Sequence, residues 1–175
     1  IAAGVSGVIY LRKQNLKWDI VEVAAVEISL VFFFIAIVLG SIWARPAWNT
    51  WWTWEPRLTT AAITELIYVA YFMLRNGIED PDRRARFGAV YTLVGAVSVP
   101  ITFLAIRIFR TIHPVVIGTQ SAEAQGGFNM TGDMKVAFFF ALFAFTVIFV
   151  DLFWNRIRLG NLAKLVEERK LNLMK

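Results

Sequence analysis

The feature of this sequence with the clearest chemical meaning is a concentration of indole rings. Five of the seven tryptophans fall within twelve residues, at positions Trp43, Trp48, Trp51, Trp52 and Trp54. Several large flat π surfaces so close together suit a flat aromatic ligand such as a porphyrin. An indole belt at a membrane surface is the alternative, but such belts usually place about one or two tryptophans at a helix end. The spacing therefore favours a platform for a flat cofactor, with Pro46 and Pro56 fixing the chain path on either side.

Charged residues flank this platform. Arg45 and Arg57 could each pair with a carboxylate of a porphyrin through two parallel hydrogen bonds, and lipid headgroups are their alternative partners. Glu55 lies next to the last tryptophan of the run, so we expect it to form a local ion pair with one of these two arginines.

His113 is the only histidine, and the sequence has no cysteine. This composition excludes metal sites built from two or more imidazoles of this sequence, thiolate sites, disulfides and covalent haem attachment through Cys-x-x-Cys-His. One imidazole can still be an axial ligand of a haem held without covalent bonds. Because Pro114 disfavours helix in the residue before it, we expect His113 to stand where a helix stops, at the mouth of a bundle.

The elements that must position these residues are membrane-spanning helices. The sequence is 58% hydrophobic and 15% aromatic, with a mean hydropathy of +0.58, which exceeds the need of a water-soluble core. Apolar runs over 20–42, 58–74, 87–106 and 136–154 predict four complete spans, and the run 1–11 predicts an incomplete fifth. The runs are continuous and do not alternate, so we predict an all-α polytopic helical bundle and not a barrel.

The basic residues predict the orientation of this bundle. Of the eighteen Lys and Arg residues, thirteen lie in segments 12–19 and 75–86 and in the tail 155–175. The positive-inside tendency places these segments in the cytoplasm, so the tryptophan-rich loop 43–57 and the His-bearing loop 107–135 share the outer face. The net charge of +5 thus reflects membrane topology and does not indicate nucleic-acid binding. We expect one membrane-embedded domain over residues 1–175, with a short helix from residue 161 lying along the cytoplasmic surface.

Four acidic residues fall inside the predicted spans, at Glu22, Glu27, Glu65 and Asp151. We interpret them as packing partners between helices, and a proton or ion path is the alternative. Two glycines seven residues apart, Gly88 and Gly95, predict a close approach of a second helix. We find no nucleotide-binding or hydrolase motif, and we predict a protein that is not an enzyme.

Residues 43–59, with the sequence WARPAWNTWWTWEPRLT, resemble the tryptophan-rich signature of the haem-handling proteins of cytochrome c biogenesis, and are most similar to the CcmC family. The resemblance covers nearly the whole chain. It implies a bundle of six helices whose outer tryptophan-rich loop and two outer histidines bind haem b without covalent bonds. It also implies transfer of the haem to the chaperone CcmE with the help of the ABC-type complex CcmA/CcmB and CcmD, in which CcmC is not the ATPase.

The resemblance assigns roles to individual residues. The signature tryptophans match the five named above, its proline matches Pro46 and its later histidine matches His113. This sequence departs from the signature at Ala44 and Asn49, where glycine is common, and at Glu55, where aspartate is common. The earlier histidine would precede the second family helix, which corresponds here to 1–11, so we expect the first helix and one axial ligand upstream of residue 1.

These observations predict a haem-binding and delivery protein of a bacterial or organellar inner membrane, with the tryptophan-rich and His-bearing loops on the periplasmic side. The predicted cofactor site consists of His113 as the axial ligand of the haem iron, with Trp43, Trp48, Trp51, Trp52, Trp54, Arg45 and Arg57. Two alternatives are a transporter or channel that uses Glu27 and Glu65, and a fragment of a larger cytochrome c synthetase-type protein. A b-type electron-transfer subunit is least favoured, because it needs paired histidines within its helices.

Overall fold

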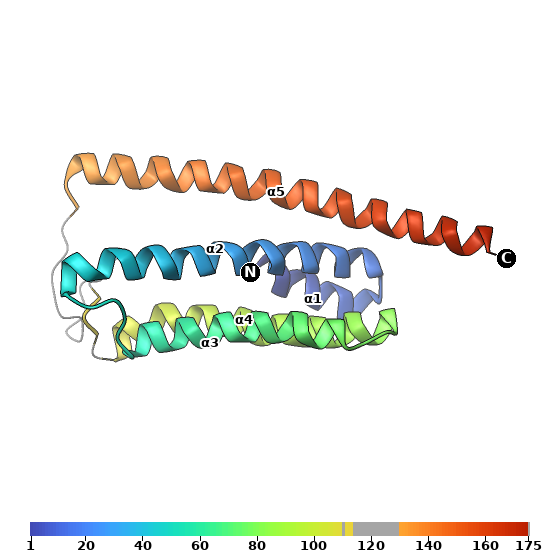
Figure 1. Cartoon of the computed structure of the whole chain (residues 1–175), viewed down its shortest axis with the longest axis horizontal. Helices are drawn as coiled ribbons and strands as arrows, with labels where there is room; N and C mark the ends of the chain where they lie inside the picture. Colours follow the sequence, from blue (N-terminus) through green and yellow to red (C-terminus); the bar gives the residue numbers. More distant parts are fainter. Residues whose placement is uncertain (110, 114–129, 175) are drawn as a thin grey trace.

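The computed structural model describes residues 1–109, 111–113 and 130–174, and every regular element in these ranges is an α-helix (Figure 1). The five helices are α1 (Ala2–Lys13), α2 (Leu16–Trp48), α3 (Pro56–Asn76), α4 (Pro81–Ile108) and α5 (Gly132–Leu173). The predicted all-α fold class is confirmed.

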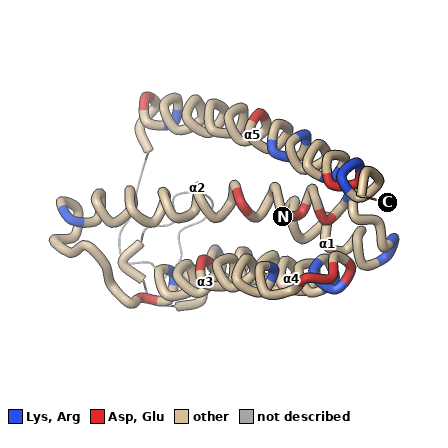
Figure 2. The backbone as a smooth tube through the Cα atoms, turned by 45° about the vertical axis from the view of Figure 1, so that its right-hand side comes forward, with Lys and Arg blue, Asp and Glu red and all other residues tan. Residues whose placement is uncertain are grey.

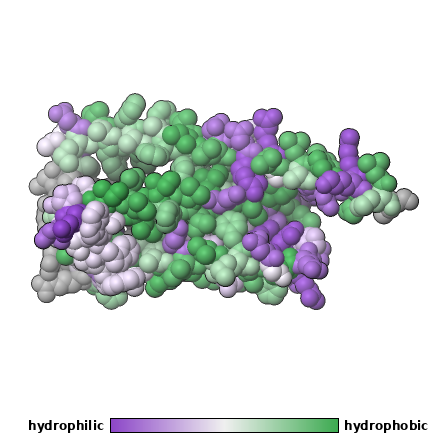
Figure 3. Space-filling model, in the orientation of Figure 1, coloured by the Kyte–Doolittle hydropathy of each residue, from purple (hydrophilic) through white to green (hydrophobic). Residues whose placement is uncertain are grey.

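Four of these helices are long and apolar enough to cross a membrane. The candidate spans are Leu16–Trp48, Pro56–Asn76, Pro81–Thr102 and Gly132–Leu173. Green, hydrophobic surface covers the middle of the face drawn in Figure 3, between paler and purple surface toward its two ends. This distribution matches a bundle whose middle lies in the apolar part of a bilayer, and it confirms the predicted polytopic membrane architecture.

Helix α2 extends beyond the predicted span. It continues through Pro46 and ends at Trp48, where Asn49 adopts the left-handed conformation, with φ 56°. Asparagine tolerates this conformation better than most residues and is a common helix terminator. Trp43 and Trp48 therefore lie on a helix, and the connecting loop comprises residues 49–55 instead of the predicted 43–57.

The tightest packing is between α3 and α4, and small residues make it possible. A Cβ atom on Gly88 of α4 would lie 2.6 Å from Arg75 Nη1, and one on Gly95 would lie 2.6 Å from Tyr68 Cε1. Both of these neighbours belong to α3. The predicted close approach of a second helix at this pair of glycines is confirmed.

The remaining helices surround this pair unequally. Helix α1 packs against both α2 and α4, whereas α5 packs only against α2 among the described helices. An ion pair joins Arg156 Nε of α5 to Glu27 Oε2 of α2 at 2.5 Å, and the rings of Phe32 and Phe145 meet edge to face at 6.4 Å. Helix α5 has no buried residue and runs unbroken to Leu173, so the tail is not the separate surface helix that we expected.

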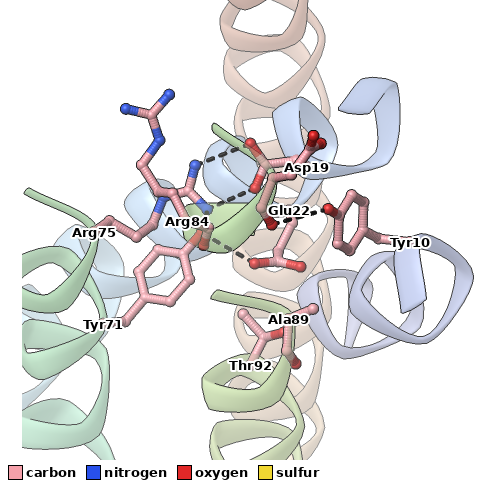
Figure 4. Close-up of polar contacts among 9 residues, drawn as sticks. Tyr10, Asp19, Glu22, Tyr71, Arg75, Arg84, Ala89 and Thr92 are labelled. Carbon is pink, nitrogen blue, oxygen red and sulfur yellow. Dashed lines mark hydrogen bonds and ion pairs between the residues drawn. The ribbon is translucent and has the colours of Figure 1, made fainter. Parts of the chain in front are cut away.

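A polar cluster lies at the end of the bundle where α1 joins α2 and α3 joins α4 (Figure 4). Arg75 donates to both carboxylate oxygens of Asp19, at 2.5 and 2.9 Å. Tyr71 Oη donates to Glu22 Oε1 at 3.2 Å, and the guanidinium carbon of Arg75 lies 5.4 Å from the Tyr71 ring centroid. Glu22 and Glu27 thus join α2 to other helices, which confirms their interpretation as packing partners.

We call this region the basic end, because its surface carries Arg12, Lys13, Lys17, Arg83, Arg84 and Arg86. Figure 2 shows blue and red residues gathered toward it. The opposite end, formed by residues 43–57 and 111–113, is called the tryptophan end.

Candidate functional site

The loop at the tryptophan end is held against the helix from which it emerges. Ser41 Oγ of α2 donates to the Trp51 carbonyl at 2.8 Å, and Thr50 Oγ1 donates to the Trp52 carbonyl at 3.0 Å. Arg45 Nη1 donates to the backbone carbonyl and the side-chain oxygen of Asn49, both at 2.7 Å. These bonds fold residues 49–55 back over the end of α2.

A cavity of about 650 Å³ opens beneath this loop. Its lining includes four of the five clustered tryptophans, Trp43, Trp48, Trp51 and Trp52, together with Arg57 and His113. It continues inward between the helices, along Ser29 of α2, Tyr68 of α3 and Val99 of α4, and Phe149 of α5 borders it. Its size lies within the range of about 300–1,000 Å³ that is common for small-molecule and cofactor sites.

The aromatic rings around the cavity meet edge to face. The Trp48 ring lies 4.9 Å from the Trp43 ring at an interplanar angle of 89°, and 4.7 Å from the His113 ring at 64°. Trp52 and Trp54 meet at 5.5 Å and 79°. The tryptophans therefore form walls of different orientation instead of a parallel stack, and the single imidazole belongs to one of these walls.

His113, which follows α4, is held by Glu55, the residue that precedes α3. Its Nδ1 contacts Glu55 Oε1, and the second oxygen of the same carboxylate accepts hydrogen bonds from Thr111 Oγ1 and from the Ile112 amide, the latter at 3.0 Å. The His113 amide donates to Thr111 Oγ1 at 3.1 Å. The expectation that Glu55 bonds to Arg45 or Arg57 is wrong, because its carboxylate reaches across to residues 111–113.

The environment of His113 favours the neutral ring. Burial lowers the pKa of His113 below its usual value of 6.5; the Glu55 carboxylate opposes this shift and the Arg57 guanidinium adds to it. A neutral imidazole keeps one nitrogen lone pair, which is the form that can bind a metal.

The other predicted site residues lie in different positions. Trp54 is 76% exposed and does not line the cavity, and Arg45 is engaged with Asn49 outside it. Residues 114–129 of the predicted loop 107–135 lie outside the described residues.

Two polar atoms at the cavity add to the predicted site, one from the predicted residue Trp52 and one from Thr53, which was not singled out from the sequence. Within the described part of the chain, Trp52 Nε1 and Thr53 Oγ1 are buried without a hydrogen-bond partner, and both residues line the cavity. Hydrogen-bonding groups in such positions are available to a ligand. The sequence pattern signals only the indole, because a threonine in a loop has no distinguishing feature.

The acidic residues of the transporter alternative, Glu27 and Glu65, lie on different helices. Glu27 pairs with Arg156 and lines a separate cavity of about 370 Å³ between α2 and α5. Glu65, on α3, lines neither of the two cavities. No group of three or more His, Asp or Glu side chains arranged for a metal ion occurs within the described ranges.

Comparison with known proteins gives a consistent result. The family model described as Heme exporter protein C matches residues 1–172. The chain is 36% identical over 134 residues to Heme exporter protein C of Bradyrhizobium diazoefficiens, covering 77% of this chain and 49% of that protein. It is 29% identical over 170 residues to the protein of the same name from Escherichia coli K12, and the match covers 97% of this chain and 64% of that protein. It is 30% identical over 155 residues to Heme exporter protein C of Paracoccus denitrificans, and the match covers 88% of this chain and 63% of that protein. The chain thus spans about half to two thirds of the length of these relatives.

Proposed function

The chain belongs to the Heme exporter protein C (CcmC) family, and from this premise we propose that it binds haem at its tryptophan end and delivers it during cytochrome c maturation. One observation carries the proposal: a single cavity at one end of the membrane bundle brings four tryptophans and the only histidine together.

The residues at this cavity fit a haem. When bound, haem would supply a metal that accepts a nitrogen ligand and two carboxylates that accept hydrogen bonds. His113 would hold the iron as a neutral axial ligand, and the indole walls would contact the macrocycle. Arg57 and Trp52 Nε1, which has no hydrogen-bond partner among the described residues, would bind the propionates, because a guanidinium and an indole N–H are both hydrogen-bond donors. Arg45 and Trp54, which lie outside the lining, remain predicted contacts at its rim.

The form of the site suits a carrier that releases its cargo. Trp43 and Trp51 border the cavity yet remain 55% and 56% exposed, so a ligand between them would be only partly enclosed. Partial enclosure favours the faster dissociation that transfer requires. The protein would therefore position haem without performing bond chemistry of its own, and we propose that it is not an enzyme.

The proposed orientation follows from charge. Because basic residues collect at the basic end, we place that end in the cytoplasm and the tryptophan end on the periplasmic side of a bacterial inner membrane, or the equivalent side of an organellar inner membrane. Haem held there would be accessible to a chaperone on the same side. We propose the haem chaperone CcmE as acceptor and CcmA/CcmB with CcmD as the associated complex.

The test measures the haem content of the protein expressed from its full-length gene in the presence of haem and purified in detergent. Both His113→Ala and the double variant Trp51→Ala, Trp52→Ala should lose most of the haem absorbance. Trp154→Ala is the matched control, because Trp154 is 62% exposed on α5 and away from the cavity, and it should retain haem. Undiminished haem in both site variants would show that the cavity is not the binding site.

A further inference from the structure

Glu55 is the N-cap residue of α3, a position at which a carboxylate usually caps the helix that follows it. It is the residue preceding α3, where acidic side chains accept hydrogen bonds from the first free amides of the helix. Here it makes no side-chain bond to that helix. The carboxylate is directed instead toward a segment more than fifty residues away in sequence, so its local capping role has given way to a long-range contact.

The carboxylate is fixed by its other contacts. One oxygen accepts hydrogen bonds from the Thr111 hydroxyl and the Ile112 amide, and the second oxygen contacts His113 Nδ1. The Glu55 side chain is 9% exposed and that of His113 is 17% exposed, so water competes little for this contact. A carboxylate held by two independent donors cannot rotate freely, and it therefore holds the imidazole ring in one orientation.

This geometry has a consequence for the ring nitrogens. If Nδ1 of the neutral ring carries the proton and donates it to Glu55, the lone pair resides on Nε2. We infer that Glu55 is the positioning residue for His113, fixing the tautomer that presents Nε2 to the haem iron and strengthening Nε2 as a ligand. The inference rests on the proposed function and extends it to a residue that does not itself touch the iron.

The charge on Glu55 should also tune the iron. A carboxylate that accepts the Nδ1 proton increases the electron density of the imidazole and makes Nε2 a stronger donor. Stronger donation stabilises ferric over ferrous iron and strengthens the iron–histidine bond. A residue that only ties the start of α3 to residues 111–113 would have neither effect.

The test compares Glu55→Gln with the wild-type complete chain, both loaded with haem. Glutamine keeps the shape but removes the charge. We expect haem affinity to fall about 10–100-fold, the iron–histidine stretching frequency of the ferrous haem to decrease, and its midpoint potential to rise. Glu65→Gln is the matched control: it makes the same chemical change on α3 outside the cavity lining, and it should leave all three measurements unchanged.

A second variant covers the case in which Glu55→Gln does not accumulate. Thr111→Val removes the hydroxyl that holds the carboxylate, and it should shift the frequency and the potential in the same directions by smaller amounts. The inference is overturned if the accumulating variant retains both the wild-type frequency and the wild-type potential. If His113→Ala and the double variant Trp51→Ala, Trp52→Ala both bind haem like the wild type, the proposed function fails. Haem that depends on His113 but not on Glu55 or Thr111 rejects the positioning role alone.

Discussion

The two ends of the bundle differ in how closely their polar side chains are packed. At the basic end, Arg75, Asp19, Glu22 and Tyr71 bond to one another, and Gly88 lets them close the space between α3 and α2. At the tryptophan end, a cavity of about 650 Å³ remains open and the Trp52 indole N–H is without a partner within the described ranges.

This difference separates stability from binding. The bonds between α2 and α3 at the basic end hold these helices together. Glu22 Oε2 has no hydrogen-bond partner within the described ranges, but Glu22 is fully buried and is therefore not open to a ligand. A site lined by partly exposed indoles contributes less to folding but leaves surface for a cofactor. Substitutions at the basic end should therefore lower the free energy of unfolding, and substitutions at the tryptophan end should lower haem binding.

The largest effect is expected for Arg75→Met. Removing this cation leaves the Asp19 carboxylate without its ion-pair partner, and breaking a buried ion pair in this way costs about 3–5 kcal/mol. Denaturant unfolding of the detergent-solubilised protein measures the loss. Arg45→Met is the counterpart at the tryptophan end. Because Arg45 is exposed and bonds only to Asn49 in the described structure, its replacement should cost under about 0.5 kcal/mol. Equal losses would remove the contrast between the ends.

A smaller loss is expected for Gly88→Ala. The added methyl group would lie 2.6 Å from Arg75 Nη1, 3.0 Å from Glu22 Oε1 and 3.3 Å from the Tyr71 ring, and overpacking of this kind costs about 1–3 kcal/mol. Gly40→Ala tests the same change on α2, where a Cβ would meet nothing within 4 Å. That variant should gain up to about 1 kcal/mol, because alanine favours helix more than glycine does. Comparable destabilisation of both variants would argue against close packing at Gly88.

The contact between α2 and α5 should be weaker. The Glu27 and Arg156 side chains are 44% and 31% exposed, so solvent screens their ion pair, and Glu27→Gln should cost about 0–1 kcal/mol. A double-mutant cycle with Arg156→Gln isolates the interaction. A coupling energy above about 3 kcal/mol would place this pair with the buried cluster instead.

The smallest effect on folding is expected for Trp51→Ala in the haem-free protein. Trp51 is 56% exposed, so its truncation should change the free energy of unfolding by less than about 0.5 kcal/mol, although haem binding decreases. Tyr71→Ala is the aromatic counterpart at the basic end, and because Tyr71 is fully buried it should cost about 3–5 kcal/mol. The comparison fails if the exposed indole proves as important to folding as the buried phenol.

The spans could be predicted because hydrophobicity alone decides which segments enter a bilayer. The ends of the helices could not be predicted in this way. Hydropathy falls at Trp43, yet α2 continues to Trp48, because the helix ends where Asn49 turns into the left-handed conformation and not where apolar residues stop. Asn49 was a readable signal for that boundary.

The sequence predicts that the tryptophans and His113 converge, because the charge pattern places both segments on one face. It does not predict which residue holds the imidazole. Glu55 lies beside two arginines in sequence, and local reasoning favoured them as partners. Its actual partners follow α4, and their proximity depends on how α3 and α4 pack. A contact of such long sequence separation is set by tertiary packing, which the periodicity of one sequence does not encode.

The one-sided attachment of α5 also bears on how the protein is made. Residues 132–173 leave the ribosome after α1 to α4, and the buried residues of both hydrophobic clusters belong to the earlier helices, although Phe153 of α5 packs against one of these clusters. The basic end can thus assemble during translation, before the final span has been inserted. A chain interrupted after residue 131 would lack both Phe153 against the core and Phe149 beside the cavity, and one side of the cavity would face the lipid acyl chains.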